Sequence, residues 1–149
     1  MQLVHEFTMQ VTRTGSLPIG AGPFGTRTVG IVGGGVVTGE RIAGEIVGPG
    51  ADWAVFGADG YAHVDVRLQI RTHDDAHLFL RYEGSLRTTD EMMAALRTDG
   101  ETAFGDTDWF VHARLESGAP QYAWVNRTLF VGQGRVVPGG VEYAFSRLA

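Results

Sequence analysis

The chain has 149 residues and a formal net charge of −5 at pH 7, and it contains neither cysteine nor lysine. Without these residues it cannot form disulfides, thiolate zinc sites, cysteine nucleophiles, Schiff bases or a lysine-bearing phosphate loop. The acidic balance disfavours nucleic acid and anionic membranes as partners. The length fits one domain over residues 1–149. No secretion signal or membrane-spanning apolar run is present, so we expect a cytoplasmic protein.

Apolar and polar side chains alternate along most of the chain, which is the pattern of β-strands with one buried face. The run at 61–71 is the clearest, because Val64, Val66 and Leu68 share one face while polar side chains share the other. Glycine, proline and aspartate separate the runs and predict turns. The expected strands are 3–11, 26–32, 36–37, 41–47, 53–56, 61–71, 77–83, 107–115, 122–131 and 140–147.

Only residues 89–97 favour a helix. Thr88 directly precedes this segment and Glu91 follows three residues later, which is the spacing of a capping box. Many short strands with one helix indicate a sandwich or a barrel. Closure into a barrel leaves no exposed strand edges. We therefore expect an all-β fold, a single closed antiparallel β-barrel of about 8–10 strands with one short helix.

Two sequence motifs suggest sites but have simpler structural explanations. Residues 20–25 spell G-x-G-x-x-G, yet a strand pattern rather than a helix follows them, so a turn is expected instead of a nucleotide site. His73, Asp75 and His77 could converge on a metal, but a hairpin turn fits their spacing better. We expect no metal and no cofactor.

The polar face of the 61–71 strand carries a constellation with chemical potential. His63, Asp65 and Arg67 are two residues apart, so their side chains lie about 7 Å apart on one side of the strand. If that face looks into a barrel, an acid, a base and a guanidinium share one cavity. If it looks into solvent, it is the ordinary polar side of an antiparallel strand. Alternation alone leaves both interpretations open.

Amphipathic rings form a second candidate group. Tyr122, Trp124 and Asn126 share one face of the expected 122–131 strand. Together with Trp53 and Tyr82, they either fill a core or line an apolar pocket with a few polar groups.

Taken together, these motifs resemble those of domain-of-unknown-function family 3237, also called uncharacterised protein family 0311. The resemblance covers nearly the whole chain in order, and its Gly-Ala-Asp-Trp and Tyr-Ala-Trp-x-Asn-Arg blocks are fairly specific. The main matching segments are Gly25-Thr26-Arg27, Gly50-Ala51-Asp52-Trp53, Asp59-Gly60, Asp65-Val66-Arg67, Thr72-His73-Asp74-Asp75, Tyr122-Ala123-Trp124-Val125-Asn126-Arg127 and Phe130-Val131-Gly132.

The resemblance implies a closed antiparallel barrel with a central cavity, commonly assembled as a homo-oligomer such as a dimer or tetramer. It also implies that Asp65 and Arg67 face the cavity. Leu68 and Ala76 depart from the family pattern, in which a tyrosine and a turn glycine are common.

Two functional hypotheses follow. The first is a cofactor-independent enzyme that catalyses the cyclisation or isomerisation of an apolar oxygenated biosynthetic intermediate, or an elimination from it. Asp65 would be the general base, Arg67 with Asn126 would stabilise an oxyanion, and His63 would be an alternative acid or base. The rings expected to shape the cavity are those of Trp53, Tyr82, Tyr122 and Trp124.

The second hypothesis is a non-catalytic barrel that binds a small ligand, because small barrels commonly hold one. A third, an oligomeric structural protein, would have a barrel filled by side chains. A titrating acid or base aimed into a cavity would favour the enzyme, whereas a purely apolar pocket would favour the carrier.

Overall fold

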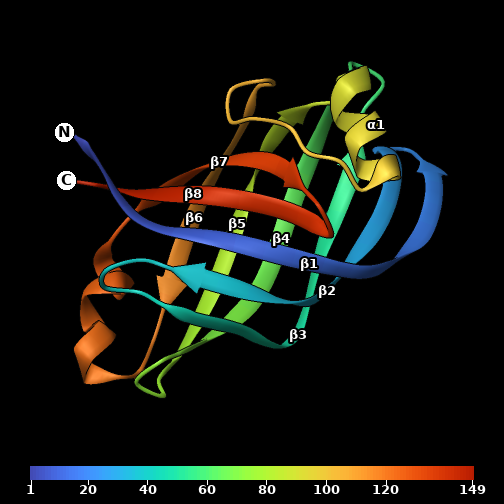
Figure 1. Cartoon of the computed structure of the whole chain (residues 1–149). Coiled ribbons are helices and arrows are strands. Elements are labelled where there is room, and N and C mark those ends of the chain that lie inside the picture. The colour runs from blue at the N-terminus through green and yellow to red at the C-terminus, as the bar shows by residue number, and fades with distance from the viewer.

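The alternating runs become strands of one sheet that closes on itself, as the computed structural model of residues 1–149 shows (Figure 1). Every strand is antiparallel to its neighbours, and β1 returns to pair with β8, with Phe7 opposite Phe145. The predicted closed barrel is confirmed, with eight strands. The elements are β1 (Leu3–Gly22), β2 (Gly25–Thr38), β3 (Gly44–Phe56), β4 (Tyr61–Thr72), β5 (His77–Arg87), α1 (Asp90–Thr98), β6 (Trp109–Glu116), the 3-10 helix η1 (Pro120–Arg127), β7 (Phe130–Val137) and β8 (Gly140–Leu148).

The strand expected at 122–131 is wrong in its first part. Residues Pro120–Arg127 form η1 instead, and β7 begins only at Phe130. Pro120 occupies the first turn, where its missing N–H costs nothing. The side chain of Asn126 then bonds to both backbone groups of Ser117, at 2.8 and 2.9 Å, which replaces strand pairing.

The single helix is present, but its cap differs by one residue from the expected one. Thr89, not Thr88, is the N-cap, and its hydroxyl accepts a hydrogen bond from the Met92 N–H at 3.2 Å. The Thr88 hydroxyl instead donates to the Gly60 carbonyl at 2.9 Å and ties the start of α1 to the β3–β4 turn. In Figure 1, α1 and η1 lie at opposite ends of the barrel.

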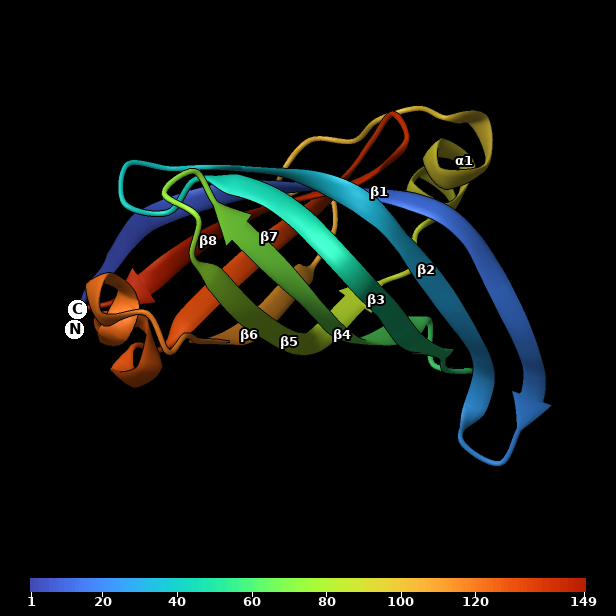
Figure 2. The same ribbon diagram turned by 90° about the horizontal axis from the view of Figure 1, so that it is seen from below.

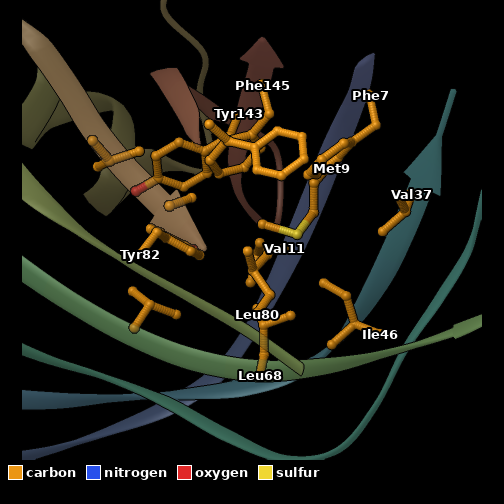
Figure 3. Packing of buried hydrophobic residues seen from close by; sticks show 14 of the residues in the cluster. Phe7, Met9, Val11, Val37, Ile46, Leu68, Leu80, Tyr82, Tyr143 and Phe145 are labelled. Carbon is orange, nitrogen blue, oxygen red and sulfur yellow. The ribbon is translucent and has the colours of Figure 1, made fainter. Parts of the chain in front are cut away.

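Two glycines in β7 make room for the aromatic core. A Cβ at Gly132 would lie 2.7 Å from the Phe145 ring, and one at Gly134 would lie 2.5 Å from the Trp109 ring. Tyr143 stacks on Phe145 with ring centroids 5.6 Å apart. Side chains from several strands pack together in the interior, as Figure 3 shows for Met9, Leu68, Leu80, Tyr82, Tyr143 and their neighbours.

A buried ion cluster supports the closure between β1 and β8. Glu6 is 7% exposed and accepts a hydrogen bond from Arg147 Nε at 2.7 Å, while Arg41 pairs with the same carboxylate. Burial alone would raise the pKa of Glu6, but the two guanidinium groups hold it below its ordinary value. The first and last strands are therefore joined by charge as well as by backbone pairing.

The β1–β2 hairpin continues beyond the barrel as a curved arm (Figure 2). Gly22 and Gly25 pair across its tip, so the G-x-G-x-x-G segment lies in a hairpin turn as expected. Separately, neither helix has the length and apolar character that a membrane crossing would require.

We expect Gly134→Ala to destabilise the barrel by about 1–3 kcal/mol, because its methyl group would overlap the buried Trp109 ring. Urea unfolding of the variant and the wild type gives the difference. Gly118→Ala is the matched control, since a Cβ there meets nothing within 4 Å. Equal stability of the two variants would contradict this account of Gly134.

Candidate functional site

The polar face of β4 points outward, not into the barrel. Val64, Val66 and Leu68 are buried in the core, whereas His63 and Arg67 are exposed and Asp65 is partly exposed. The expectation that Asp65 and Arg67 face the cavity is therefore wrong. The lumen is apolar here, and closure sends the hydrophobic face of the strand inward.

The other predicted site residues are spread over the molecule. Trp53 is 39% exposed on the outer surface, with the Arg67 guanidinium 5.6 Å from its ring centroid. Trp124 packs beneath Arg41, and Tyr122 donates a hydrogen bond to Asp74 at 2.7 Å.

Tyr122, Trp124 and Asn126 all belong to η1, which lies at the opposite end of the barrel from the cavity lining described below. Of the predicted substrate-binding residues, only Tyr82 lies in that lining.

A cavity of about 100 Å³ opens inside the α1 end of the barrel. It is somewhat smaller than an engineered apolar cavity of about 150 Å³ that holds one benzene ring. Most of its lining is apolar, and Met92 and Leu96 of α1 form part of the wall. The polar side chains in the lining are those of Arg13, Thr28, Asp52, Tyr82, Trp109 and Tyr143.

Asp52 is the carboxylate of this cavity. It lies on β3 opposite Val66 of β4, and one of its oxygens accepts a hydrogen bond from the backbone N–H of Asp65 at 3.0 Å. Burial is the largest influence on its pKa and raises it to about 6, although the Asp65 N–H and the charge of Arg13 act in the lowering direction. Asp52 can therefore bind and release a proton near neutral pH.

Two tyrosines adjoin this carboxylate inside the barrel. The rings of Tyr82 and Tyr143 meet edge to face at 4.9 Å, and the Tyr143 hydroxyl accepts a hydrogen bond from Trp109 Nε1 at 3.2 Å. Burial, followed by nearby charges that include Asp52, raises the pKa of both phenols above the ordinary value. Both hydroxyls therefore keep their protons at neutral pH and can act as hydrogen-bond donors.

Arg13 supplies a positive charge at the cavity from the base of the β1–β2 arm. Gly30 of β2 lies between Arg13 and Asp52, because a Cβ at this position would be 3.4 Å from Arg13 Cδ and 3.8 Å from Asp52 Cβ. This glycine therefore leaves the space between the guanidinium and the carboxylate open.

The side chains at the cavity suit proton transfer. Asp52 can take or give a proton, two phenols can donate hydrogen bonds, and Arg13 can attract negative charge. No group of three or more histidine, aspartate and glutamate side chains is placed to hold a metal ion. His73, Asp75 and His77 instead surround the β4–β5 turn, where Asp75 takes a positive φ of 65°.

The sequence analysis missed Asp52 because it treated residues 48–52 as the break between two strands. In the structure β3 runs through this segment with a bulge between Val47 and Ala51. The side chain of Asp52 lies on the inward face of β3, as do those of Ile46, Ala54 and Phe56. If residues 44–56 are treated as one strand, Asp52 is a single carboxylate at a position of the apolar face, and this pattern would have indicated a site residue.

Comparison with known proteins connects this chain to proteins without an assigned activity. A family model described as "Protein of unknown function (DUF3237)" matches residues 1–148. A UPF0311 protein of Rhodopseudomonas palustris is 30% identical over 116 residues, covering 75% of this chain and 74% of the relative. A UPF0311 protein of Clostridium acetobutylicum is 24% identical over 152 residues, covering 99% and 96%.

Solved structures share the fold. A conserved protein of unknown function from R. palustris has a TM-score of 0.89 at 22% identity, covering 99% of this chain and 97% of its own. A β-barrel-like protein from Acinetobacter baumannii has a TM-score of 0.84 at 24% identity, covering 99% and 96%. A protein described as an enzyme from Penicillium herquei has a TM-score of 0.72 at 16% identity, covering 99% and 94%.

The raised pKa of Asp52 predicts a specific dependence of stability on pH. The folded state holds this proton more tightly than the unfolded chain, whose aspartate titrates near 3.8. The stabilisation is therefore complete below that value and is lost as the pH rises through about 6. Relative to the wild type, Asp52→Asn should gain stability as the pH increases across this window.

Urea unfolding at several pH values between 4 and 8 measures this change, and a carboxyl ¹³C titration should give a midpoint near 6 for Asp52. Asp108→Asn, at an exposed loop position, is the control and should run parallel to the wild type. A pH profile of Asp52→Asn that also runs parallel to the wild type would contradict the assignment.

Proposed function

The chain belongs to the DUF3237 family of proteins of unknown function, and we propose that it is a cofactor-independent enzyme that moves a proton on a small apolar molecule bearing oxygen. The reaction class is cyclisation, isomerisation or elimination. The observation that carries this proposal is the position of Asp52, a carboxylate in an apolar cavity beside two protonated phenols.

Asp52 serves as the base in this proposal. A carboxylate in a largely apolar site is weakly solvated, so its proton affinity rises toward the operating pH, where general base catalysis is most effective. The hydrogen bond from the Asp65 N–H fixes one carboxylate oxygen and thereby orients the other. Asp65 thus contributes through its backbone, and the role expected for its side chain passes to Asp52.

The charge that develops on the substrate oxygen needs donors. The Tyr143 hydroxyl is positioned by the Trp109 indole N–H, and Tyr82 packs against it. Arg13 adds an attractive potential for an enolate or phenolate. Hydrogen bonds from preoriented phenols in a site of low polarity stabilise such an anion more strongly than water does.

The volume of the cavity limits the substrate. A space of about 100 Å³ admits a single small ring system, and a larger molecule must extend beyond the cavity. Apolar side chains surround most of this space, so the reacting part of the substrate is expected to be hydrocarbon-rich with one oxygen near Tyr143.

A small-ligand carrier remains the second candidate, and the apolar lining is the observation that favours it. The two functions differ in what Asp52 does. In a carrier it would at most bind the ligand, whereas in an enzyme its removal lowers the rate of turnover by orders of magnitude.

Ring opening of 1,2-benzisoxazole tests the enzyme without knowledge of the natural substrate. In this reaction a base takes the carbon-bound proton, the N–O bond breaks with its electron pair leaving on oxygen, and a nitrile and a phenolate form. We expect the wild type to exceed an equal concentration of acetate, with a rate that rises with pH around a midpoint of about 6. Asp52→Asn should lose roughly 10²–10⁴-fold.

The control is Asp65→Asn. It removes a carboxylate on the outer surface but keeps the backbone N–H that donates a hydrogen bond to Asp52. It should retain the wild-type rate within a few fold. Binding of benzisoxazole without acceleration, or equal rates for wild type and Asp52→Asn, would reject the enzyme in favour of the carrier.

A further inference from the structure

A second cavity lies beside the one that holds Asp52. Its volume is about 190 Å³, and its wall comes from α1, from the turn between β7 and β8, and from Arg13 of β1. These elements meet at the same end of the barrel (Figure 1). Arg13, Leu96 and Gly140 line both cavities, so the two spaces adjoin along these residues. A ligand that extends beyond the Asp52 cavity therefore has a second space to enter.

The second cavity differs from the first in its two charged side chains, Arg13 and Asp99. Asp99 accepts a hydrogen bond from the Gly139 N–H at 2.6 Å, so its carboxylate is held against the β7–β8 turn. Arg13 bonds to the same turn only through its backbone, whose N–H donates to the Gly139 carbonyl at 3.2 Å. Its exposed guanidinium takes part in none of the ion pairs of the structure, whereas five other arginines do. The N–H groups of this guanidinium are therefore available to a ligand.

Arg13 stands at the junction of the apolar and the charged space. Its charge acts to lower the pKa of Asp52 against the larger effect of burial, yet the two side chains form no ion pair. A guanidinium at such a junction can hold the charged end of a ligand whose apolar end lies in the barrel. Its planar fork of N–H groups matches the two oxygens of a carboxylate.

We propose that the ligand of this protein is a carboxylic acid, with its apolar part in the Asp52 cavity and its carboxylate on Arg13 in the second cavity. The inference rests on the proposed function, because it takes the Asp52 cavity as the place where the reacting part of the substrate lies. It adds the substrate class, which is an apolar ring or chain with a terminal carboxylate that is separate from the oxygen at which charge develops.

Asp99 favours a carboxylate over a phosphate in this space. A phosphate monoester carries a charge of about −1.5 to −2 near neutral pH, whereas a carboxylate carries a single charge. The one guanidinium of Arg13 neutralises one negative charge. The second charge of a phosphate would have no cation in the cavity and would share the space with the carboxylate of Asp99.

Calorimetric titration of the full chain with 3-phenylpropanoate and with 3-phenylpropanamide tests the inference. The two molecules have almost the same shape, and the amide lacks the charge. We expect the wild type to bind the acid at least about fivefold more tightly than the amide at neutral pH. Arg13→Gln should reduce this preference to less than about twofold, because glutamine keeps a polar side chain at this position without the guanidinium.

Arg97→Gln is the matched control. It removes the same charge from an exposed position of α1 that lines neither cavity, so the preference for the acid should stay at its wild-type value. Circular dichroism and the melting temperature establish that each variant is folded. The inference is overturned if the wild type binds acid and amide equally, if Arg13→Gln keeps the preference, if Arg97→Gln loses it, or if the acid does not bind at about 10 mM.

Titration with 3-phenylpropyl phosphate separates the two kinds of anion. The wild type should bind it less tightly than 3-phenylpropanoate, and tighter binding would overturn the carboxylate in favour of a phosphate. Asp99→Asn should strengthen phosphate binding about threefold or more, because asparagine removes the charge but keeps an oxygen for the Gly139 N–H. Asparagine also tolerates the positive φ of 56° at this position. An unchanged phosphate affinity in Asp99→Asn would contradict the selection assigned to Asp99.

These titrations involve no proton transfer, and the ring opening of neutral 1,2-benzisoxazole involves no carboxylate on the substrate. If ring opening does not depend on Asp52 but the preference for the acid is present, the enzyme is rejected and the carboxylate site at Arg13 stands. If ring opening depends on Asp52 but the preference is absent, the carboxylate site is rejected and the enzyme stands.

Discussion

Closure of the sheet between β1 and β8 is the constraint on which the rest of this structure depends. Once the ring is complete, each strand of the barrel has one face toward the lumen and one face toward the outside. The apolar residues of β4 are thereby committed to the core, and His63, Asp65 and Arg67 are committed to the surface. The Glu6 cluster with Arg147 stabilises the same junction.

The lumen is divided between packing and a cavity. Phe7, Phe130 and Phe145 fill the part of the core beneath η1, and Gly132 allows the Phe145 ring to lie close to the wall. Toward α1 the side chains no longer meet, and a space lined mostly by apolar groups remains. Burial at such a space removes part of the water that would solvate a carboxylate, which is why the pKa of Asp52 rises.

The wall of the barrel therefore separates two kinds of chemistry across a single layer of backbone. Asp52 accepts a hydrogen bond from the N–H of Asp65, while the Asp65 side chain lies on the outer face, 4.0 Å from Arg81. The inner face concentrates weakly solvated donors and acceptors, as proton transfer requires. The outer face carries fully charged side chains such as Arg67 and Arg81, which are exposed to solvent.

Period-two alternation and the distance between turns are local properties of the chain, so the sequence by itself indicated an all-β fold with about the right number of strands. The family followed from the resemblance of its motif blocks, not from this periodicity. The sequence could not identify η1, because Tyr122, Trp124 and Asn126 alternate as the residues of a strand do. The hydrogen bonds between Asn126 and the backbone of Ser117, which accompany the coil, form only in the folded chain. The sequence pattern also predicted a break between two strands at residues 48–52. Asp52 was therefore not assigned to either face of a strand, although β3 is continuous there. Tertiary structure alone decided which face of each strand is interior and which side chains meet there, because closure is set by pairing between β1 and β8, more than a hundred residues apart.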